Sequence, residues 1–212
     1  MSIVRKLPNP WTDSRVLGPM DYGISRIPQA YTSSTLMKTP EGPWLHDLTS
    51  WALNAQRNRV IGKSVVLWGA HGRGKTSAAV ALLKGMMSRG QSGLFVRYDQ
   101  LMSTSRMRVV YDKDMTLDEK SLEVDVLLID DLFNGFDADP ERYTRCLQQI
   151  IRTRHDKLAV TLMTTNVATE KWGKFMSPAL ETLVVNNWSV ISMDEAPNER
   201  QRLSREIYKR RT

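Results

Sequence analysis

Short apolar runs alternate along the chain with stretches in which apolar residues recur at helical spacing. Continuous apolar runs of this length are typical of strands that are buried in a parallel sheet. We predict five such strands, at residues 64–68, 93–96, 124–129, 159–164 and 190–193. Because helical patterns separate them, the sequence predicts an α/β fold with a mostly parallel, doubly wound sheet and helices on both faces.

The helical stretches have recognisable ends. Gly90 is a stop signal, while Asp139 and Pro140 form a start, because the aspartate can cap the helix and the proline presets the first turn. We predict helices from Trp44 onward, over residues 75–88, over residues 100–110, and from Asp139 to about His155.

Two segments lack a clear pattern. Residues 1–43 contain six prolines and little periodicity, which predicts an irregular N-terminal arm in front of one domain at 44–212. Residues 112–123 are acidic and are predicted to be a surface connection. The tryptophans Trp44, Trp51 and Trp68 are expected to pack in the core rather than to stack on bases.

A glycine-rich loop lies between the first strand and the following helix and satisfies the pattern G-x-x-x-x-G-K-[ST]. This strand and helix are the context that the phosphate-binding P-loop requires. Its glycines let backbone N–H groups point at phosphate oxygens, and the helix N-terminus adds positive potential. We expect Lys75 to bridge the β- and γ-phosphates of ATP and Thr76 to ligate Mg²⁺. The loop is Gly69-Ala70-His71-Gly72-Arg73-Gly74-Lys75-Thr76.

Polar side chains end two of the other predicted strands. Asp130 and Asp131 close the run at 124–129, and Asn166 follows the run at 159–164. Since the carboxyl ends of parallel strands meet at one edge of a sheet, these groups should lie beside the P-loop. Asp130 is expected to hold Mg²⁺, Asp131 to act as the general base that orients water, and Asn166 to reach the γ-phosphate or the water.

The composition of the chain indicates what kind of partner it binds and in which compartment it is found. The net charge of +7 and a pI near 9.6 favour a polyanionic partner such as nucleic acid. The only cysteine, Cys146, excludes an internal disulfide. Neither an apolar secretory signal nor a run of the ~18 apolar residues that a membrane span needs is present, so we expect a cytoplasmic protein without membrane contact.

The chain resembles the AAA+ bacterial helicase loaders, DnaC and DnaI, and the related transposition ATPase IstB. The resemblance covers about residues 25–200, and the run LLIDDL with a following TTN and KWG is its most specific part. The matching residues are Ile27-Pro28-Gln29-Ala30-Tyr31, the P-loop, Leu94-Phe95-Val96 with Leu101, LLIDDL at 127–132, Thr164-Thr165-Asn166 and Lys171-Trp172-Gly173.

This resemblance implies an AAA+ ATPase with ATP and Mg²⁺ as cofactors. It also implies a homo-oligomer, a spiral or ring, that assembles on single-stranded DNA and delivers a replicative ring helicase to it. Arg200 is the first candidate for the sensor arginine of this family, and Arg202 is the second. Residues 167–212 leave room only for a truncated C-terminal lid, and the short chain suggests a phage or other mobile element as its source.

One departure concerns the arginine finger, which the family places between the sensor asparagine and the sensor arginine. Residues 167–199 contain no arginine, and Thr182 stands near the expected place. Either Arg152 or Arg154 supplies the finger, or hydrolysis is slow, because a finger contributes roughly 10³- to 10⁵-fold in rate. Two alternatives stay open for the function: a transposition regulator that resembles IstB, and a nucleotide-binding switch or kinase without DNA contact.

Overall fold

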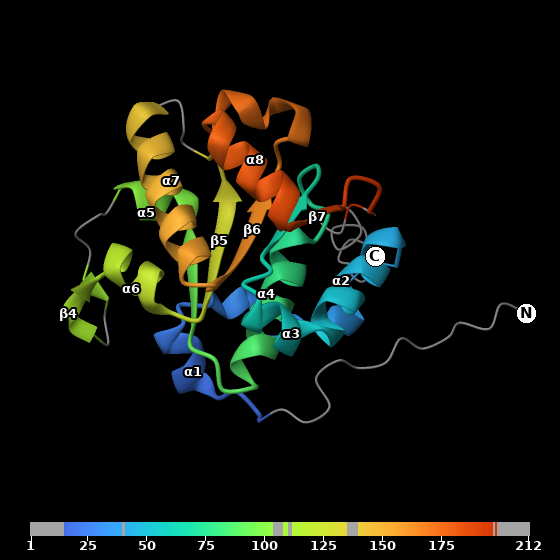
Figure 1. Cartoon of the computed structure of the whole chain (residues 1–212). Coiled ribbons are helices and arrows are strands. Elements are labelled where there is room, and N and C mark those ends of the chain that lie inside the picture. Colours follow the sequence, from blue (N-terminus) through green and yellow to red (C-terminus); the bar gives the residue numbers. More distant parts are fainter. Residues whose placement is uncertain are drawn as a thin grey trace, which may run out of the picture.

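A five-stranded, wholly parallel sheet forms the centre of the computed structural model, which describes residues 15–39, 41–103, 108–109, 112–134, 140–196 and 198 (Figure 1). Every pairing in this sheet is parallel, in the order β2-β5-β6-β1-β7. The strands are β1 (Val65–Trp68), β2 (Gly93–Arg97), β5 (Val126–Leu132), β6 (Val160–Thr165) and β7 (Ser189–Ser192). The predicted α/β fold with a parallel sheet is therefore confirmed.

Helices cover both faces of the sheet, as predicted, because alternate residues of each strand point to opposite sides. Val65 and Leu67 pack toward α2 and α4, whereas Val66 packs toward the side of α7 and α8. The first face carries α2 (Pro43–Leu53), α3 (Ala55–Val60) and α4 (Lys75–Met87), and the second carries α5 (Tyr98–Ser103), α6 (Leu117–Glu123), α7 (Pro140–Asp156), η4 (Thr169–Lys174) and α8 (Pro178–Asn187).

The strand order determines what meets at the carboxyl edge of the sheet. β6 lies between β5 and β1, so the residues that follow these three strands are neighbours. The order reverses here, because the chain runs from β1 to β2 at the far edge and later returns to β6. Ligands of open α/β sheets bind in the crevice at such a point.

Two predictions for the segment between β2 and β5 were wrong. The helix predicted over 100–110 is α5, which ends at Ser103, and Arg108–Val109 form strand β3 instead. Serine side chains compete for backbone hydrogen bonds, which favours a helix end at this point. The acidic segment contains β4 (Asp112–Thr116), which pairs with β3, and then α6. Its charges mask the apolar Leu117 and Leu122 of α6, which pack against the core.

The N-terminal arm is described from residue 15 onward. It contains α1 (Pro19–Ile24), η1 (Gln29–Tyr31) and η2 (Leu36–Lys38). Ile27 and Leu36 are buried against the core, and the Ser25 carbonyl accepts a hydrogen bond of 2.7 Å from the Phe95 N–H of edge strand β2. Trp44 and Trp51 also lie in this core, as predicted.

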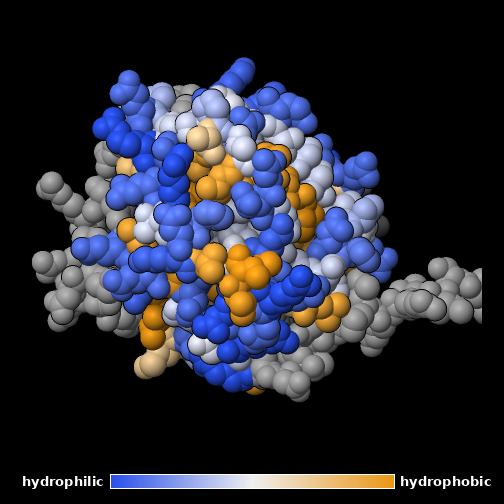
Figure 2. Space-filling model, in the orientation of Figure 1, coloured by the Kyte–Doolittle hydropathy of each residue, from blue (hydrophilic) through white to orange (hydrophobic). Residues whose placement is uncertain are grey.

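The surface seen in Figure 2 is mainly hydrophilic, with hydrophobic residues gathered near the middle of the view. Among the exposed hydrophobic residues are Val60 and Leu158, which line one hollow of 690 Å³ near the amino ends of β5 and β6. Of the helices in the described ranges, none is both long enough and apolar enough to cross a membrane.

Candidate functional site

The loop between β1 and α4 has a backbone that only glycine adopts easily. Gly72 and Gly74 have φ angles of 78° and 81°, in the left-handed region. Gly69 has a φ of 147°, and a Cβ there would lie 2.9 Å from the backbone of Met193 and Asp194. This loop conformation therefore requires glycine at these positions of the motif, as expected for a loop that binds an anion.

Lys75 opens α4 and is 6% exposed. Its ammonium group donates hydrogen bonds of 2.8 Å to the carbonyls of Gly69 and Ala70 and one of 2.6 Å to Oδ1 of Asn166. The P-loop lysine and the asparagine that follows β6 thus meet, a contact that the sequence did not predict. An ammonium group placed beside the loop in this way suits a phosphate, because hydrogen bonds from a cation to a phosphate are strong.

Asp130 lies at the end of β5, is 5% exposed, and accepts hydrogen bonds from two hydroxyl groups. Thr164 Oγ1 donates to its Oδ1 at 2.6 Å, and the Thr76 side chain also bonds to it. Burial raises the pKa of Asp130, and the charge of Asp131 raises it further, while the Thr164 and Thr76 hydroxyls and Lys75 oppose the rise. A carboxylate beside a hydroxyl is an oxygen donor set that Mg²⁺ accepts, so Thr76 and Asp130 fit this ion.

Asp131 adopts the left-handed conformation, with a φ of 54°, next to an irregular register between β5 and β6. Its N–H donates to Thr164 Oγ1 at 3.0 Å, so Thr164 contacts both acids. Phe133 also has a positive φ of 73°, and its ring stacks on Phe175 with a centroid distance of 4.7 Å. Such conformations in bulky residues cost free energy and gather at functional sites. The bulge turns Asp131 toward the pocket beside the P-loop, where it is one of the lining residues.

A pocket of 310 Å³ joins these groups to the N-terminal arm. Ala30 and Tyr31 of the arm form one wall. The rest is formed by residues 71–77 of the P-loop and the start of α4, together with Asp131 and Asn166. The wall from the arm consists of one small and one aromatic residue, whereas the other lining residues are mostly charged or polar. In the sequence, Ala30 and Tyr31 stand out only as part of the family resemblance, because a proline-rich segment has no periodic pattern that would predict its position in the fold.

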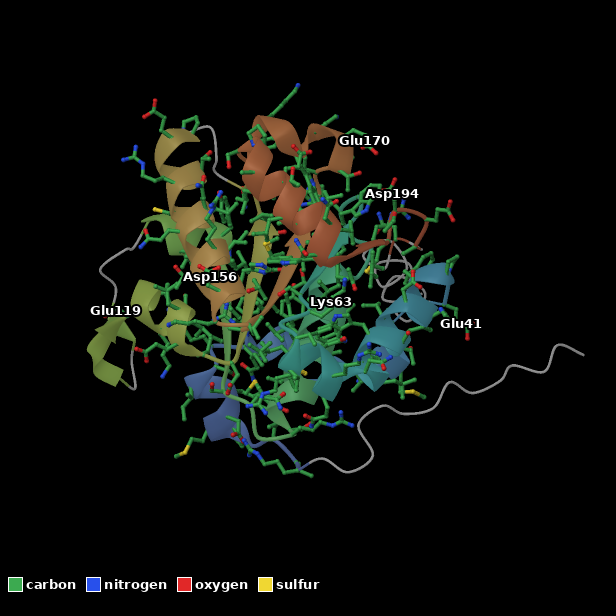
Figure 3. All side chains as sticks on the ribbon, viewed as in Figure 1. Glu41, Lys63, Glu119, Asp156, Glu170 and Asp194 are labelled. Atoms are coloured by element: carbon green, nitrogen blue, oxygen red, sulfur yellow. The ribbon has the colours of Figure 1, made fainter. Side chains whose placement is uncertain are left out.

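The segment after β7 was missed altogether. Asp194, labelled in Figure 3, accepts a hydrogen bond of 2.8 Å from the Ala70 N–H, and the Arg73 guanidinium donates to the Ala196 carbonyl. A Cβ on Gly72 would meet the Asn198 side chain at 2.6 Å. Asp194, Ala196 and Asn198 therefore lie against the P-loop. No pattern in the sequence indicates these contacts, which depend on β7 lying beside β1.

The two candidates for the arginine finger, Arg152 and Arg154, differ in exposure. Arg154 is completely buried, and its guanidinium donates to Thr161 Oγ1 and to the carbonyls of Ser121, Val124, Asp125 and Val160. The hypothesis that Arg154 reaches a neighbouring subunit is therefore wrong. Arg152, two residues earlier on α7, is exposed, as is Thr182 on α8. Arg200 and Arg202 lie outside the described residues, so their predicted sensor role stays a prediction.

Solved structures with the same fold include proteins of bacterial replication. A structure of the DnaC helicase loader is 21% identical with a TM-score of 0.66, and the match covers 78% of this chain and 99% of that chain. A structure of DnaI is 20% identical with a TM-score of 0.61 and covers 78% and 94%. DnaA from Aquifex aeolicus, bound to AMPPCP, is 16% identical with a TM-score of 0.62; the match covers 84% of this chain but about half, 56%, of that protein.

These identities show the AAA+ fold alone. Among curated proteins, none matches the chain by sequence. A family model, described as IstB-like ATP binding protein, matches residues 49–186, which include the P-loop, both acids and Asn166. The match spans well over half of the chain and agrees with the resemblance to DnaC, DnaI and IstB. The chain belongs to the IstB-like family of ATP-binding proteins.

Proposed function

We propose that the chain hydrolyses ATP in this pocket. The meeting of Lys75, Asp130, Asp131 and Asn166 beside the P-loop carries the proposal. Lys75 exchanges its carbonyl partners for β- and γ-phosphate oxygens, and Asn166 contacts the γ-phosphate or the attacking water. Asp131 accepts a proton from that water. Thr76 and Asp130 hold Mg²⁺, which neutralises charge on the phosphates when it is bound.

We further propose that the ATP-bound form assembles on single-stranded DNA and loads a replicative ring helicase. The fold shared with the DnaC and DnaI helicase loaders supports this reading, as does the net charge of +7. Positive charge lowers the free energy of binding to a phosphate backbone by releasing counterions. Arg152, exposed near the C-terminal end of α7, is the remaining candidate for a finger among the described residues. Without a finger, hydrolysis is slow and the ATP form persists.

The family model favours a second candidate. IstB-like proteins include a transposition ATPase in the resemblance described above, and the matched segment contains the whole proposed catalytic set. A regulator of this kind would act on duplex target DNA and recruit a transposase rather than a helicase. The two candidates differ in the DNA that the ATP form prefers.

Fluorescence anisotropy with a labelled oligothymidine and a labelled duplex of the same length separates the candidates. A non-hydrolysable ATP analogue with Mg²⁺ should strengthen binding to the single strand, and the affinity should fall steeply between 50 and 200 mM salt. Preference for the duplex would favour the transposition regulator. The Lys75→Ala variant is the matched control, since its DNA binding should not respond to nucleotide. DNA binding that ignores nucleotide in the wild type would contradict both candidates.

A further inference from the structure

Strand β5 does not keep a regular register with β6 where it carries Asp131. Ile129 of β5 pairs with Met163 of β6, and the next pair is Leu132 with Thr165. From one pair to the other, β5 advances three residues and β6 only two. β5 therefore holds one extra residue, as a β-bulge does, and bulges beside active sites often change the direction of a side chain.

Hydrogen bonds within the bulge and to β6 hold part of it. The Asp131 carbonyl accepts from the Asn134 N–H at 3.0 Å, and the Leu132 carbonyl accepts from Thr165 Oγ1 at 3.2 Å. Asp131 and Phe133 nevertheless both have a positive φ, of 54° and 73°. Residues other than glycine keep this conformation only where the surrounding structure enforces it, so contacts outside the bulge are needed.

The Phe133 ring makes such contacts. It stacks on the Phe175 ring with a centroid distance of 4.7 Å and an interplanar angle of 21°. The Tyr98 ring meets it edge-on, with the centroids 6.2 Å apart. Phe133 is 6% exposed and Tyr98 is completely buried. Stacked and edge-to-face rings stabilise each other beyond the effect of burial, so these contacts favour the bulged conformation.

Phe175 belongs to the segment that follows Asn166. Its N–H donates to the Trp172 carbonyl at 2.8 Å, and Trp172 is completely buried. The Trp172 Nε1–H donates in turn to the carbonyl of Val167, directly after Asn166, at 2.9 Å. The two stacked rings thus join the bulge that carries Asp131 to the loop that carries Asn166.

We infer that Phe175 is a positioning residue that acts through Phe133: the two stacked rings hold the bulge, and the bulge keeps the Asp131 carboxylate directed at the pocket. This inference rests on the proposed hydrolysis of ATP with Asp131 as the base. Neither phenylalanine is among the described residues that line the pocket. The stack should therefore affect the chemical step and not the binding of ATP.

The variant Phe175→Leu keeps an apolar side chain but removes the ring. Its rate constant for single-turnover hydrolysis of Mg·ATP should fall about 10- to 100-fold, the loss expected when a reacting group is misplaced by a fraction of an ångström to about 1 Å. Its calorimetric affinity for a non-hydrolysable ATP analogue with Mg²⁺ should stay unchanged. A wild-type rate, or a loss of affinity that accounts for the slower reaction, would overturn the inference.

A double-mutant cycle with Asp131→Asn tests whether the ring acts through the carboxylate. Adding Phe175→Leu to Asp131→Asn should lower the rate no further, because the group that the ring positions is already absent. The same fold-loss in both backgrounds would overturn the inference, since Phe175 would then act through another group. A wild type that does not hydrolyse ATP, or unchanged turnover in Asp131→Asn alone, would instead overturn the proposed function.

Phe95→Leu is the matched control. Phe95 is 4% exposed and belongs to the core on the opposite face of the sheet. This variant should have a lower melting temperature but the wild-type rate of hydrolysis, and a comparable loss of rate would contradict a specific role for the stack. Where Phe175→Leu does not fold, Phe133→Leu removes the same stack from its other side and should lower the rate by a similar factor. A wild-type rate in Phe133→Leu would overturn the inference.

Discussion

Two buried cations lie at opposite ends of the same parallel sheet. Lys75, at the carboxyl edge, bonds to two loop carbonyls and to the Asn166 side chain, and it borders an open pocket. Arg154, at the amino edge, donates five hydrogen bonds to groups around the starts of β5 and β6 and is completely buried. Burial lowers the pKa of Arg154 to about 10, so it stays charged at neutral pH.

The comparison indicates that Lys75 is placed to bind a ligand, whereas Arg154 stabilises the fold. The partners of Lys75 lie on loops beside a pocket, where a phosphate can replace them. The partners of Arg154 are mostly carbonyls around the end of α6 and the starts of β5 and β6, which the guanidinium ties together inside the folded framework. The exposed fraction of the side chain does not separate the two residues, because both are buried. The position of their hydrogen-bond partners separates them.

The largest expected effect concerns the chemistry at the carboxyl edge. Asp131→Asn should lower the rate of ATP hydrolysis about 10²- to 10⁴-fold, because the amide cannot accept the proton of the water. Asparagine tolerates the left-handed φ of 54° found here, so fold and ATP affinity should be retained. Single-turnover hydrolysis and calorimetric ATP binding check the two parts. Unchanged turnover would refute the role of Asp131 as base.

The next effect concerns the amino edge. Arg154→Leu leaves buried carbonyls without a donor and should lower the free energy of unfolding by roughly 3–5 kcal/mol. Arg152→Leu, on the same helix but exposed, should change it by less than about 0.5 kcal/mol. Urea unfolding followed by circular dichroism measures both. If Arg154→Leu were as stable as Arg152→Leu, the assignment of Arg154 to folding would be wrong.

A smaller effect is expected at Asp130, whose pKa is raised chiefly by burial. An acid with a raised pKa in the folded protein contributes stability below its unfolded pKa, and this contribution is lost as the pH rises through the folded pKa. At pH 7, Asp130→Asn removes the buried charge and should raise the unfolding temperature of the nucleotide-free protein by about 2–4 °C, or ~1 kcal/mol. At pH 4 the difference should shrink. Thermal melts at both pH values check this, and a lower melting temperature at pH 7 would contradict it.

The sequence predicted the parts of the site that depend on short-range patterns. The P-loop needs glycines and a lysine at fixed spacing, and the apolar runs before Asp130 and Asn166 mark buried strands whose carboxyl ends meet in a parallel sheet. The expectation that Asn166 lies beside the P-loop therefore followed from topology. From the sequence, Arg152 and Arg154 were both candidates for the arginine finger, because a sequence does not show which side of a helix end is buried by other segments.

The parts that could not be predicted depend on packing between distant segments. Asp194 reaches Ala70 only because β7 pairs with β1, and Lys84 reaches Thr32 only because the arm crosses α4. The bulge that turns Asp131 likewise depends on Thr164 in the neighbouring strand. In residues 112–123, a high density of charge concealed Leu117 and Leu122, which pack against the core.

The central claim is that the Lys75 ammonium binds the phosphates of ATP, whereas the buried Arg154 guanidinium only stabilises the fold. Calorimetric titration of Mg·ATP into the wild type and into Lys75→Ala tests it most directly. Loss of charge-assisted hydrogen bonds to phosphate should weaken ATP binding by about 100-fold or more. The melting temperature of the nucleotide-free variant should stay within a few degrees of wild type. Equal ATP affinity in the two proteins would contradict the account.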